Sequence, residues 1–187
     1  MINYWTMENQ NDSKLILRVK PGCNLKVRPI CKLIRVLEIY AGYGKYLYLE
    51  NENSGQLLKD KYPDRLGRPS DRYACWVINR KDGSLRILDM PYYVYRPLFD
   101  RELSIDKKIY DSQFGGDWNI TTNGKKGKGV RYKTVFVEKA PISEDEMNMI
   151  RNKKSEQDDY FDLSKIYDIC SFEQADAKLT NSYVAPN

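Results

Sequence analysis

The segment best suited to contact a polyanion is a short basic loop in the second half of the chain. Residues 124–129 read GKKGKG, so that this loop consists of three lysines and three glycines. Lysines on a flexible loop can follow a phosphate backbone without a fixed geometry. The order G-x-x-x-x-G-K-[ST] of a nucleotide-binding loop is absent, so the alternatives are a nucleic-acid contact and a solvated turn. The cations of this region are Lys125, Lys126, Lys128, Arg131 and Lys133.

Aromatic residues are the second chemical signal. Tyrosine occurs 15 times, and many rings on the expected strands lie within a few residues of Lys or Arg. Unpaired bases stack on such rings, with about 1–3 kcal/mol per base, while neighbouring cations neutralise phosphates. Any one ring can instead belong to the hydrophobic core, and we expect some of them to be buried. The rings that we expect to stack on bases are Tyr46, Tyr48, Trp76, Trp118 and Tyr132.

Catalytic and metal-binding constellations are missing from the sequence. There is no histidine, which excludes Ser-His and Cys-His nucleophiles, and acid–base chemistry would need Asp, Glu, Lys or Tyr. The four cysteines show no C-x-x-C spacing, so we expect reduced thiols, with pairing or metal sharing by Cys23 and Cys31 as the alternative. The acidic clusters lack calcium-loop spacing. We therefore expect no enzyme, no cofactor and no metal.

The elements that must position these residues are mainly short strands joined by hairpin turns. Asp82-Gly83 predicts one such turn, and Ser143 with Glu146 predicts a capping box that opens a helix. Alternating hydrophobic residues predict strands over residues 14–20, 24–28, 32–40, 45–50, 72–79, 84–90, 117–123 and 130–138. Helical segments are expected at residues 56–61, at 92–110 with an interruption at Pro97, and at 143–153.

This pattern predicts a mostly β fold, a small Greek-key barrel of the OB type with flanking helices. With 187 residues, the chain can form one domain with a tail. We expect an N-terminal lead over residues 1–13 and the barrel over residues 14–141. Residues 142–187 would form an acidic segment that is helical or partly disordered.

Charge is divided unequally along the chain. Residues 1–140 hold 26 Lys and Arg against 16 Asp and Glu, a net charge of +10, and residues 141–187 hold 5 against 10, a net charge of −5. A basic body suits a polyanionic partner, whereas an acidic tail can compete for the same groove or recruit proteins. A second basic edge consists of Lys26, Arg28, Lys32 and Arg35.

Targeting signals are not found in the sequence. No apolar run approaches the roughly 20 residues that span a bilayer, and the first residues, MINYWTMENQ, lack the regions of a signal peptide. We therefore expect a cytoplasmic protein without a membrane partner.

Several motifs follow one another in a recognisable order. Residues 69–88 read PSDRYACWVINRKDGSLRIL and contain an R-x-D-G turn, and a helical segment at residues 92–99 comes next. A G-x-D strand at residues 115–120, the basic turn, an Arg-Tyr strand start at 131–132 and the segment PISEDE at 141–146 complete the series. In this order the chain resembles the OB-fold single-stranded DNA-binding proteins of tailed bacteriophages, over about residues 14–150.

The resemblance implies binding and protection of single-stranded DNA during DNA replication, recombination or repair, in the cytoplasm of an infected bacterial host. It implies a recruiting role for the acidic tail toward replication or recombination proteins, although the chain ends YVAPN without a terminal acidic cluster. Some relatives carry a zinc-binding insert, but residues 50–69 hold no cysteine or histidine. The alternatives are a viral adaptor or inhibitor that binds a protein, and an RNA-binding OB module. The residues to which the resemblance points are Arg72, Tyr73, Trp76, Trp118, Arg131 and Tyr132.

Overall fold

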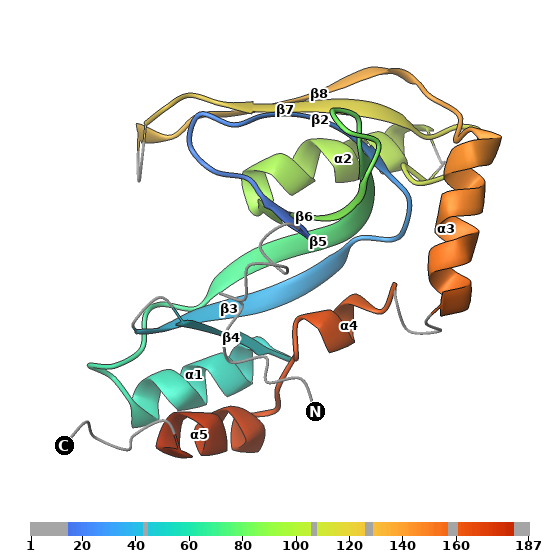
Figure 1. Cartoon of the computed structure of the whole chain (residues 1–187). Coiled ribbons are helices and arrows are strands. Elements are labelled where there is room, and N and C mark those ends of the chain that lie inside the picture. The colour runs from blue at the N-terminus through green and yellow to red at the C-terminus, as the bar shows by residue number, and fades with distance from the viewer. Residues whose placement is uncertain (1–14, 43–44, 106–107, 126–128, 157–160, 182–187) are drawn as a thin grey trace. The chain divides into compact units, whose positions relative to one another are not determined.

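The computed structural model describes residues 15–42, 45–105, 108–125, 129–156 and 161–181 (Figure 1). Contacts within the chain divide these residues into two compact units. The larger unit holds residues 15–34 and 73–163, and the smaller unit holds residues 35–72 and 164–181. The predicted division at residue 141 does not coincide with these units, and the domain and tail remain a prediction.

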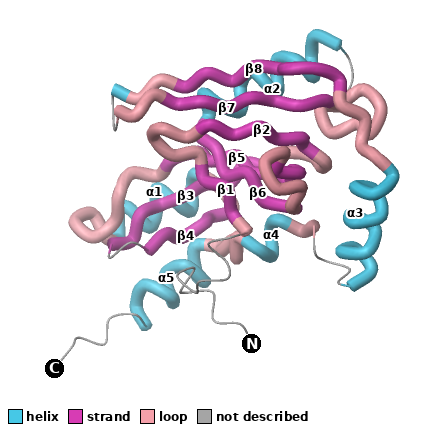
Figure 2. The backbone as a smooth tube through the Cα atoms, turned by 45° about the horizontal axis from the view of Figure 1, so that its top comes forward, coloured by secondary structure: helices cyan, strands magenta, loops and turns pink. Residues whose placement is uncertain are grey.

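The larger unit is built on a mixed sheet. Its strands follow the order β1-β6-β5-β2-β7-β8, and Figure 2 shows β8, β7, β2 and β5 side by side. β1 runs parallel to β6, whereas β2 is antiparallel to β5 and β7, and β7 is antiparallel to β8. The bounds are β1 Ile16–Arg18, β2 Asn24–Pro29, β5 Ser70–Asn79, β6 Leu85–Pro91, β7 Gly116–Thr122 and β8 Tyr132–Lys139.

The mostly β fold predicted from the sequence is confirmed, including the eight expected strands. Gly83 has a φ of 69° in the turn between β5 and β6, which explains the need for glycine there. Among the described residues, β1 pairs only with β6 and β8 only with β7, so the pairing is that of an open sheet. A closed barrel needs its end strands to pair with each other, and the OB-type barrel therefore stays a prediction.

Helix α2 (Tyr92–Ile105) packs against β6 and β8 and lies between them in Figure 1. The interruption expected at Pro97 is wrong, because α2 continues through this residue. Proline removes one backbone hydrogen bond from a helix. The fully buried Val94 and Leu98 hold α2 on the sheet on either side of Pro97, which offsets that loss.

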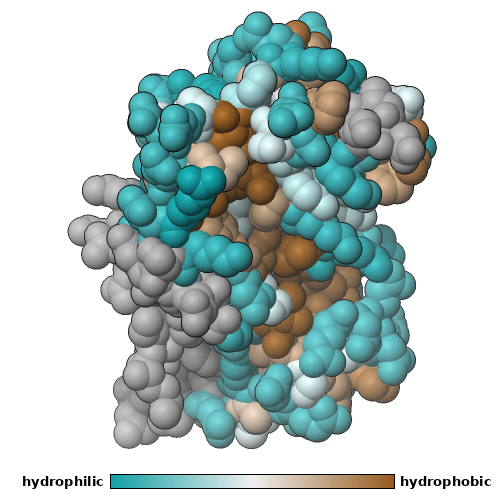
Figure 3. Space-filling view, turned by 90° about the vertical axis from the view of Figure 1, so that its right-hand side faces the viewer, coloured by the Kyte–Doolittle hydropathy of each residue, from teal (hydrophilic) through white to brown (hydrophobic). Residues whose placement is uncertain are grey.

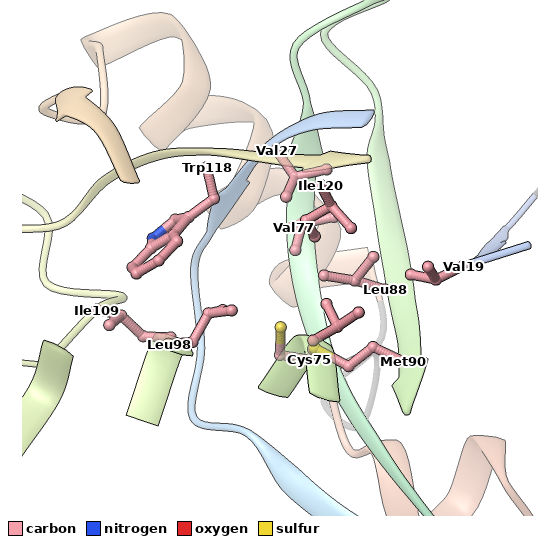
Figure 4. Packing of buried hydrophobic residues seen from close by; sticks show 11 residues of the cluster. Val19, Val27, Cys75, Val77, Leu88, Met90, Leu98, Ile109, Trp118 and Ile120 are labelled. Atoms are coloured by element: carbon pink, nitrogen blue, oxygen red, sulfur yellow. The ribbon is translucent and has the colours of Figure 1, made fainter. Parts of the chain in front are cut away.

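The core of the larger unit lies where α2 meets the sheet. Its buried residues come from β2, β5, β6, β7 and α2, and Figure 4 shows the Trp118 ring directed toward Leu98 and Ile109. Helix α3 (Glu144–Glu156) begins with the predicted capping box: Ser143 N donates to Glu146 Oε2 at 2.9 Å, and Glu146 N donates to Ser143 Oγ at 3.2 Å.

The smaller unit combines a hairpin with helices. β3 (Ile34–Gly42) and β4 (Lys45–Leu49) form the predicted antiparallel hairpin. Helix α1 (Glu52–Lys61) begins four residues earlier than expected because the Asn51 side chain caps it by accepting from Ser54 N at 2.9 Å. The remaining helices are α4 (Leu163–Ile166) and α5 (Phe172–Asn181).

Helix α5, near the C-terminus, packs against α1. In α5, Ala175 and Leu179 are buried in a hydrophobic cluster together with Leu58 of α1. Asp176 accepts hydrogen bonds from Lys61 Nζ at 2.8 Å and from the Tyr62 hydroxyl at 2.7 Å. No helix in the described parts of the chain has the length and apolar character needed to cross a membrane.

Candidate nucleic-acid interface

Six aromatic side chains form a continuous series on the larger unit, from β8 across α2 to β5. Tyr93 lies parallel to Tyr132, with an interplanar angle of 9° and ring centroids 6.2 Å apart. Tyr95 stacks on Tyr73 with centroids 3.9 Å apart and an angle of 5°. The centroid of the Tyr92 ring lies 6.2 Å from that of Tyr73, 6.0 Å from that of Tyr93 and 6.3 Å from that of Tyr95. We call the set the aromatic strip: Tyr73, Tyr92, Tyr93, Tyr95, Phe99 and Tyr132.

Helical and strand periodicity explain why these rings meet. Tyr92, Tyr95 and Phe99 follow one another at spacings of three and four residues, so they share one face of α2. On β8, the half-buried Tyr132 and Phe136 alternate with the exposed Lys133. The sequence left open which face of β8 would take part in binding, and the structure places the Tyr132 ring against α2.

The rings at the centre and at the end of the strip differ in exposure. Burial and the neighbouring Tyr73 raise the pKa of Tyr95, so its hydroxyl remains neutral over the physiological range. Tyr93 is 72% exposed and Tyr92 is 41% exposed. Tyr93 therefore presents a ring to solvent and is supported by the neighbouring Tyr132 ring.

Figure 3 shows one face of the molecule, on which hydrophilic residues surround the hydrophobic ones.

Cations accompany the strip at two places. On α2, Arg96 donates to Asp100 Oδ1 at 2.7 Å and to the Tyr92 hydroxyl at 2.8 Å, and both hydrogen bonds raise its pKa. Arg101 lies over the Phe136 ring, with its guanidinium carbon 3.4 Å from the centroid. The contacts of Arg96 hold one guanidinium group beside the strip, and Arg101 lies on Phe136, which is outside the strip.

The second place is the basic hairpin between β7 and β8, directly before Tyr132. Asn123 organises its base by donating from Nδ2 to Gly129 O at 3.0 Å and accepting from Arg131 N at 2.7 Å. The side chains of Lys125, Arg131 and Lys133 are exposed. The other two lysines of the predicted tip, Lys126 and Lys128, lie outside the described residues.

Three rings that we expected to stack on bases are buried instead. Trp76 is fully buried and meets Phe161 edge to face, with centroids 5.3 Å apart. Trp118 is 2% exposed, and Tyr48 is packed edge to face on Tyr167 in the smaller unit. Large rings on strands that pack against other elements contribute more by burial than by exposure. These three rings therefore have no exposed face on which a base could stack.

Arg28 is also an internal residue and not part of a basic surface. It is fully buried, and its guanidinium donates to Ala140 O at 2.7 Å and to Pro29 O at 2.6 Å. Further hydrogen bonds go to Ile109 O at 3.0 Å and to Asp111 O. Burial lowers its pKa, yet four carbonyl oxygens stabilise the charged form. Arg28 therefore ties β2 to the segment before β7 and to the residue that follows β8.

The other predicted cations are divided between ion pairs and surface positions. Lys26 pairs with Asp117 at 3.2 Å and Glu138 at 3.4 Å, and the hydrogen bond with Asp117 raises its pKa. Arg35 bonds with Glu52 and with Asp71. Lys32 is exposed in the larger unit. Of the remaining predicted residues, the smaller unit holds Tyr46, which is exposed beside Tyr40, and Arg72, which is half-buried.

The structure thus brings together Tyr73, Tyr132 and the basic hairpin, and it adds residues that sequence reasoning missed. The missed residues all lie on α2, within the segment YYVYRPLF at residues 92–99. The sequence contains a signal for these residues: rings spaced three and four residues apart, next to an arginine, predict an aromatic face on a helix. The sequence-based prediction placed base-stacking rings only on the expected strands.

No model of a protein family matches the chain, and a search of the curated proteins finds no match either. Within the described residues, no group of three or more Cys, Asp or Glu side chains is placed to hold a metal ion. The arrangement of stacked rings and cations is suited to binding a flat, anionic ligand.

Proposed function

We propose that the protein binds single-stranded DNA, with little sequence preference, along the aromatic strip of the larger unit. The observation that carries this proposal is the exposed Tyr93 ring, stacked on Tyr132 directly beside the basic hairpin. A base can stack on a ring that is exposed and already held in place, at a smaller entropic cost than on a mobile side chain.

The charge near the strip supports a nucleic acid over an apolar ligand. Lys125 and Arg131 lie in the hairpin that precedes Tyr132, and Arg96, which also pairs with Asp100, lies beside Tyr92. Lys133 alternates with Tyr132 along β8 and is exposed on the other face of the strand. Such cations neutralise phosphates and release counterions, which makes binding salt-dependent. Rings contact base faces only where bases are unpaired, so the strip favours a single strand over a duplex.

The cellular role is proposed from the resemblance of residues 14–150 to bacteriophage single-stranded DNA-binding proteins. By this resemblance, the protein coats and protects single-stranded DNA during replication, recombination or repair in an infected bacterial cytoplasm. The OB-type barrel and a recruiting role of the C-terminal segment toward replication or recombination proteins belong to the same proposal.

The test compares the wild type with Tyr93→Ala by fluorescence anisotropy on labelled oligo-dT at low and high salt. Loss of one stacking ring should weaken binding roughly 5- to 150-fold, the equivalent of about 1–3 kcal/mol. Phe114→Ala is the matched control, because Phe114 is a 40% exposed ring near Lys139 that lies outside the strip.

Duplex DNA and single-stranded RNA of equal length serve as competitors in the same assay. We expect duplex DNA to compete poorly and affinity to fall steeply with salt. Equal loss in Tyr93→Ala and Phe114→Ala would refute the assignment of the site. Binding that does not change with salt would refute the proposed function, and stronger competition by RNA would change the ligand to RNA.

A further inference from the structure

The four cysteines are placed in different surroundings. Cys170 lies in the smaller unit, where the Lys178 ammonium is 2.9 Å from its sulfur. Cys23, Cys31 and Cys75 lie in the larger unit. The Cys23 sulfur is 3.9 Å from Thr122 Oγ1, between β2 and β7. All four are free thiols.

The pairing of β2 with β5 ends two residues before Cys31. The paired positions are Val27 with Asn79, Arg28 with Ile78, and Pro29 with Val77. Because antiparallel partners sum to a constant number, the same register extended by two residues would pair Cys31 with Cys75. The distance of 44 residues in sequence conceals this relation.

Hydrogen bonds beyond the end of β2 show that the two segments stay together. Ile30 N donates to Trp76 O at 3.0 Å. Trp76 N then donates to the Cys31 sulfur itself, at 3.2 Å. The Cys31 sulfur is therefore held against the backbone next to Cys75.

Both side chains also face the same side of the sheet. Val27, Val77 and Cys75 belong to one buried cluster, and Cys31 packs against that cluster. In the extended register the two Cα atoms would be about 4.5–5.5 Å apart, which falls within the range of about 4.4–6.8 Å found for disulfides. For a bond to form, the Cys31 sulfur must turn from Trp76 N toward Cys75.

We propose that Cys31 and Cys75 are a redox-active pair that forms a reversible disulfide between β2 and β5. The oxidant is a low-molecular-weight disulfide such as oxidised glutathione. Cys31 loses its proton to solvent, its thiolate attacks one sulfur of glutathione disulfide, and one glutathione thiolate leaves. The Cys75 sulfur then attacks the Cys31 sulfur, and the second glutathione leaves as a thiolate that takes up the Cys75 proton. Two protein thiols are oxidised, and one glutathione disulfide is reduced to two glutathiones.

Burial determines the order of these steps. Cys31 is half-buried and accessible to a small disulfide, whereas Cys75 is fully buried. Cys31 therefore reacts first, and Cys75 resolves the mixed disulfide. Burial raises the pKa of both thiols, and the nearby Cys31 raises the pKa of Cys75 further. Both thiols are therefore protonated at rest, and oxidation requires prolonged incubation with oxidised glutathione.

The test uses the full chain in its native state, incubated with oxidised glutathione, alkylated and digested with trypsin without reduction. We expect two of the four thiols to be lost and a linked peptide pair to appear by mass spectrometry. The pair joins residues 27–32 (VRPICK) to residues 73–80 (YACWVINR), and dithiothreitol separates it. Cys23→Ser is the matched control and should leave the pair intact, whereas Cys31→Ser should abolish it.

Two results would overturn the proposal. One is a link between Cys23 and Cys31, and the other is glutathione retained on Cys31 while Cys75 stays reduced. Cys75→Ser provides a second check, because it should trap the mixed disulfide on Cys31. The readout is a covalent mass and does not depend on whether the protein binds DNA.

Discussion

Replacing the buried Arg28 with methionine should lower the free energy of unfolding by about 2–6 kcal/mol. The substitution keeps an unbranched apolar side chain in place and removes the donors that serve four carbonyl oxygens. The hydrogen bonds to Pro29 O and Ile109 O are buried, and those to Asp111 O and Ala140 O are only part-buried. An unpaired buried carbonyl costs about 1–3 kcal/mol, so two of them account for the range, while water can reach the other two.

The measurement is urea denaturation followed by circular dichroism, with Lys32→Met as the matched control. Lys32 is an exposed cation on the same segment of chain, and its loss should change the unfolding free energy by less than about 0.5 kcal/mol. Arg28→Lys should fall between the wild type and Arg28→Met, because an ammonium group cannot reach four carbonyls spread around a planar guanidinium. A loss below about 1 kcal/mol in Arg28→Met would refute the reasoning. A large fall in the DNA affinity of Arg28→Met without a loss of stability would also refute it, because Arg28 would then contact DNA.

Further variants test the remaining features. Lys125→Gln should weaken oligo-dT binding and reduce the slope of log K against log salt by about 1, measured by anisotropy titrations; an unchanged slope would remove Lys125 from the interface. Gly115→Ala should destabilise the larger unit, because a Cβ there would collide with the Arg28 guanidinium and the Ile109 carbonyl; wild-type thermal unfolding would contradict this packing. Trp118→Ala should cost about 3–5 kcal/mol of stability, measured by urea denaturation, and a cost near zero would contradict its burial. Lys61 and Tyr62 lower the pKa of Asp176 below its unfolded value, so its stabilising contribution is present above pH about 4 and is lost as the pH falls through the folded pKa. Asp176→Asn should therefore reduce the loss of stability between pH 5 and 3, and an unchanged profile from acid titration would contradict the pairing.

Local features of the fold were predictable because local interactions determine them. The Asp82-Gly83 turn, the Ser143–Glu146 capping box and the alternation along β8 depend on neighbouring residues, and the structure contains all three. The helix through Pro97 was not predictable from propensity, because the packing of Val94 and Leu98 is a tertiary effect.

The candidate site was predictable only in part. Tyr132 and the hairpin cations next to it in the sequence were predicted from composition and spacing, and the structure places Tyr132 beside Tyr93. Trp76 and Trp118 have the same local signal, a ring near cations, but they are buried. A ring on a strand faces the core or the solvent according to what packs on that face, and a single strand does not contain this information.

The sequence by itself determined the basic character of the first 140 residues, the strand and turn boundaries to within a few residues, and the absence of histidine chemistry. Only the tertiary structure decided that Arg28 is an internal support, that rings of α2 complete the surface, and that Cys31 packs against the buried cluster that contains Cys75. The reason is that charge and turn propensity belong to neighbouring residues. Burial, stacking and strand register instead depend on which distant segments meet when the chain folds.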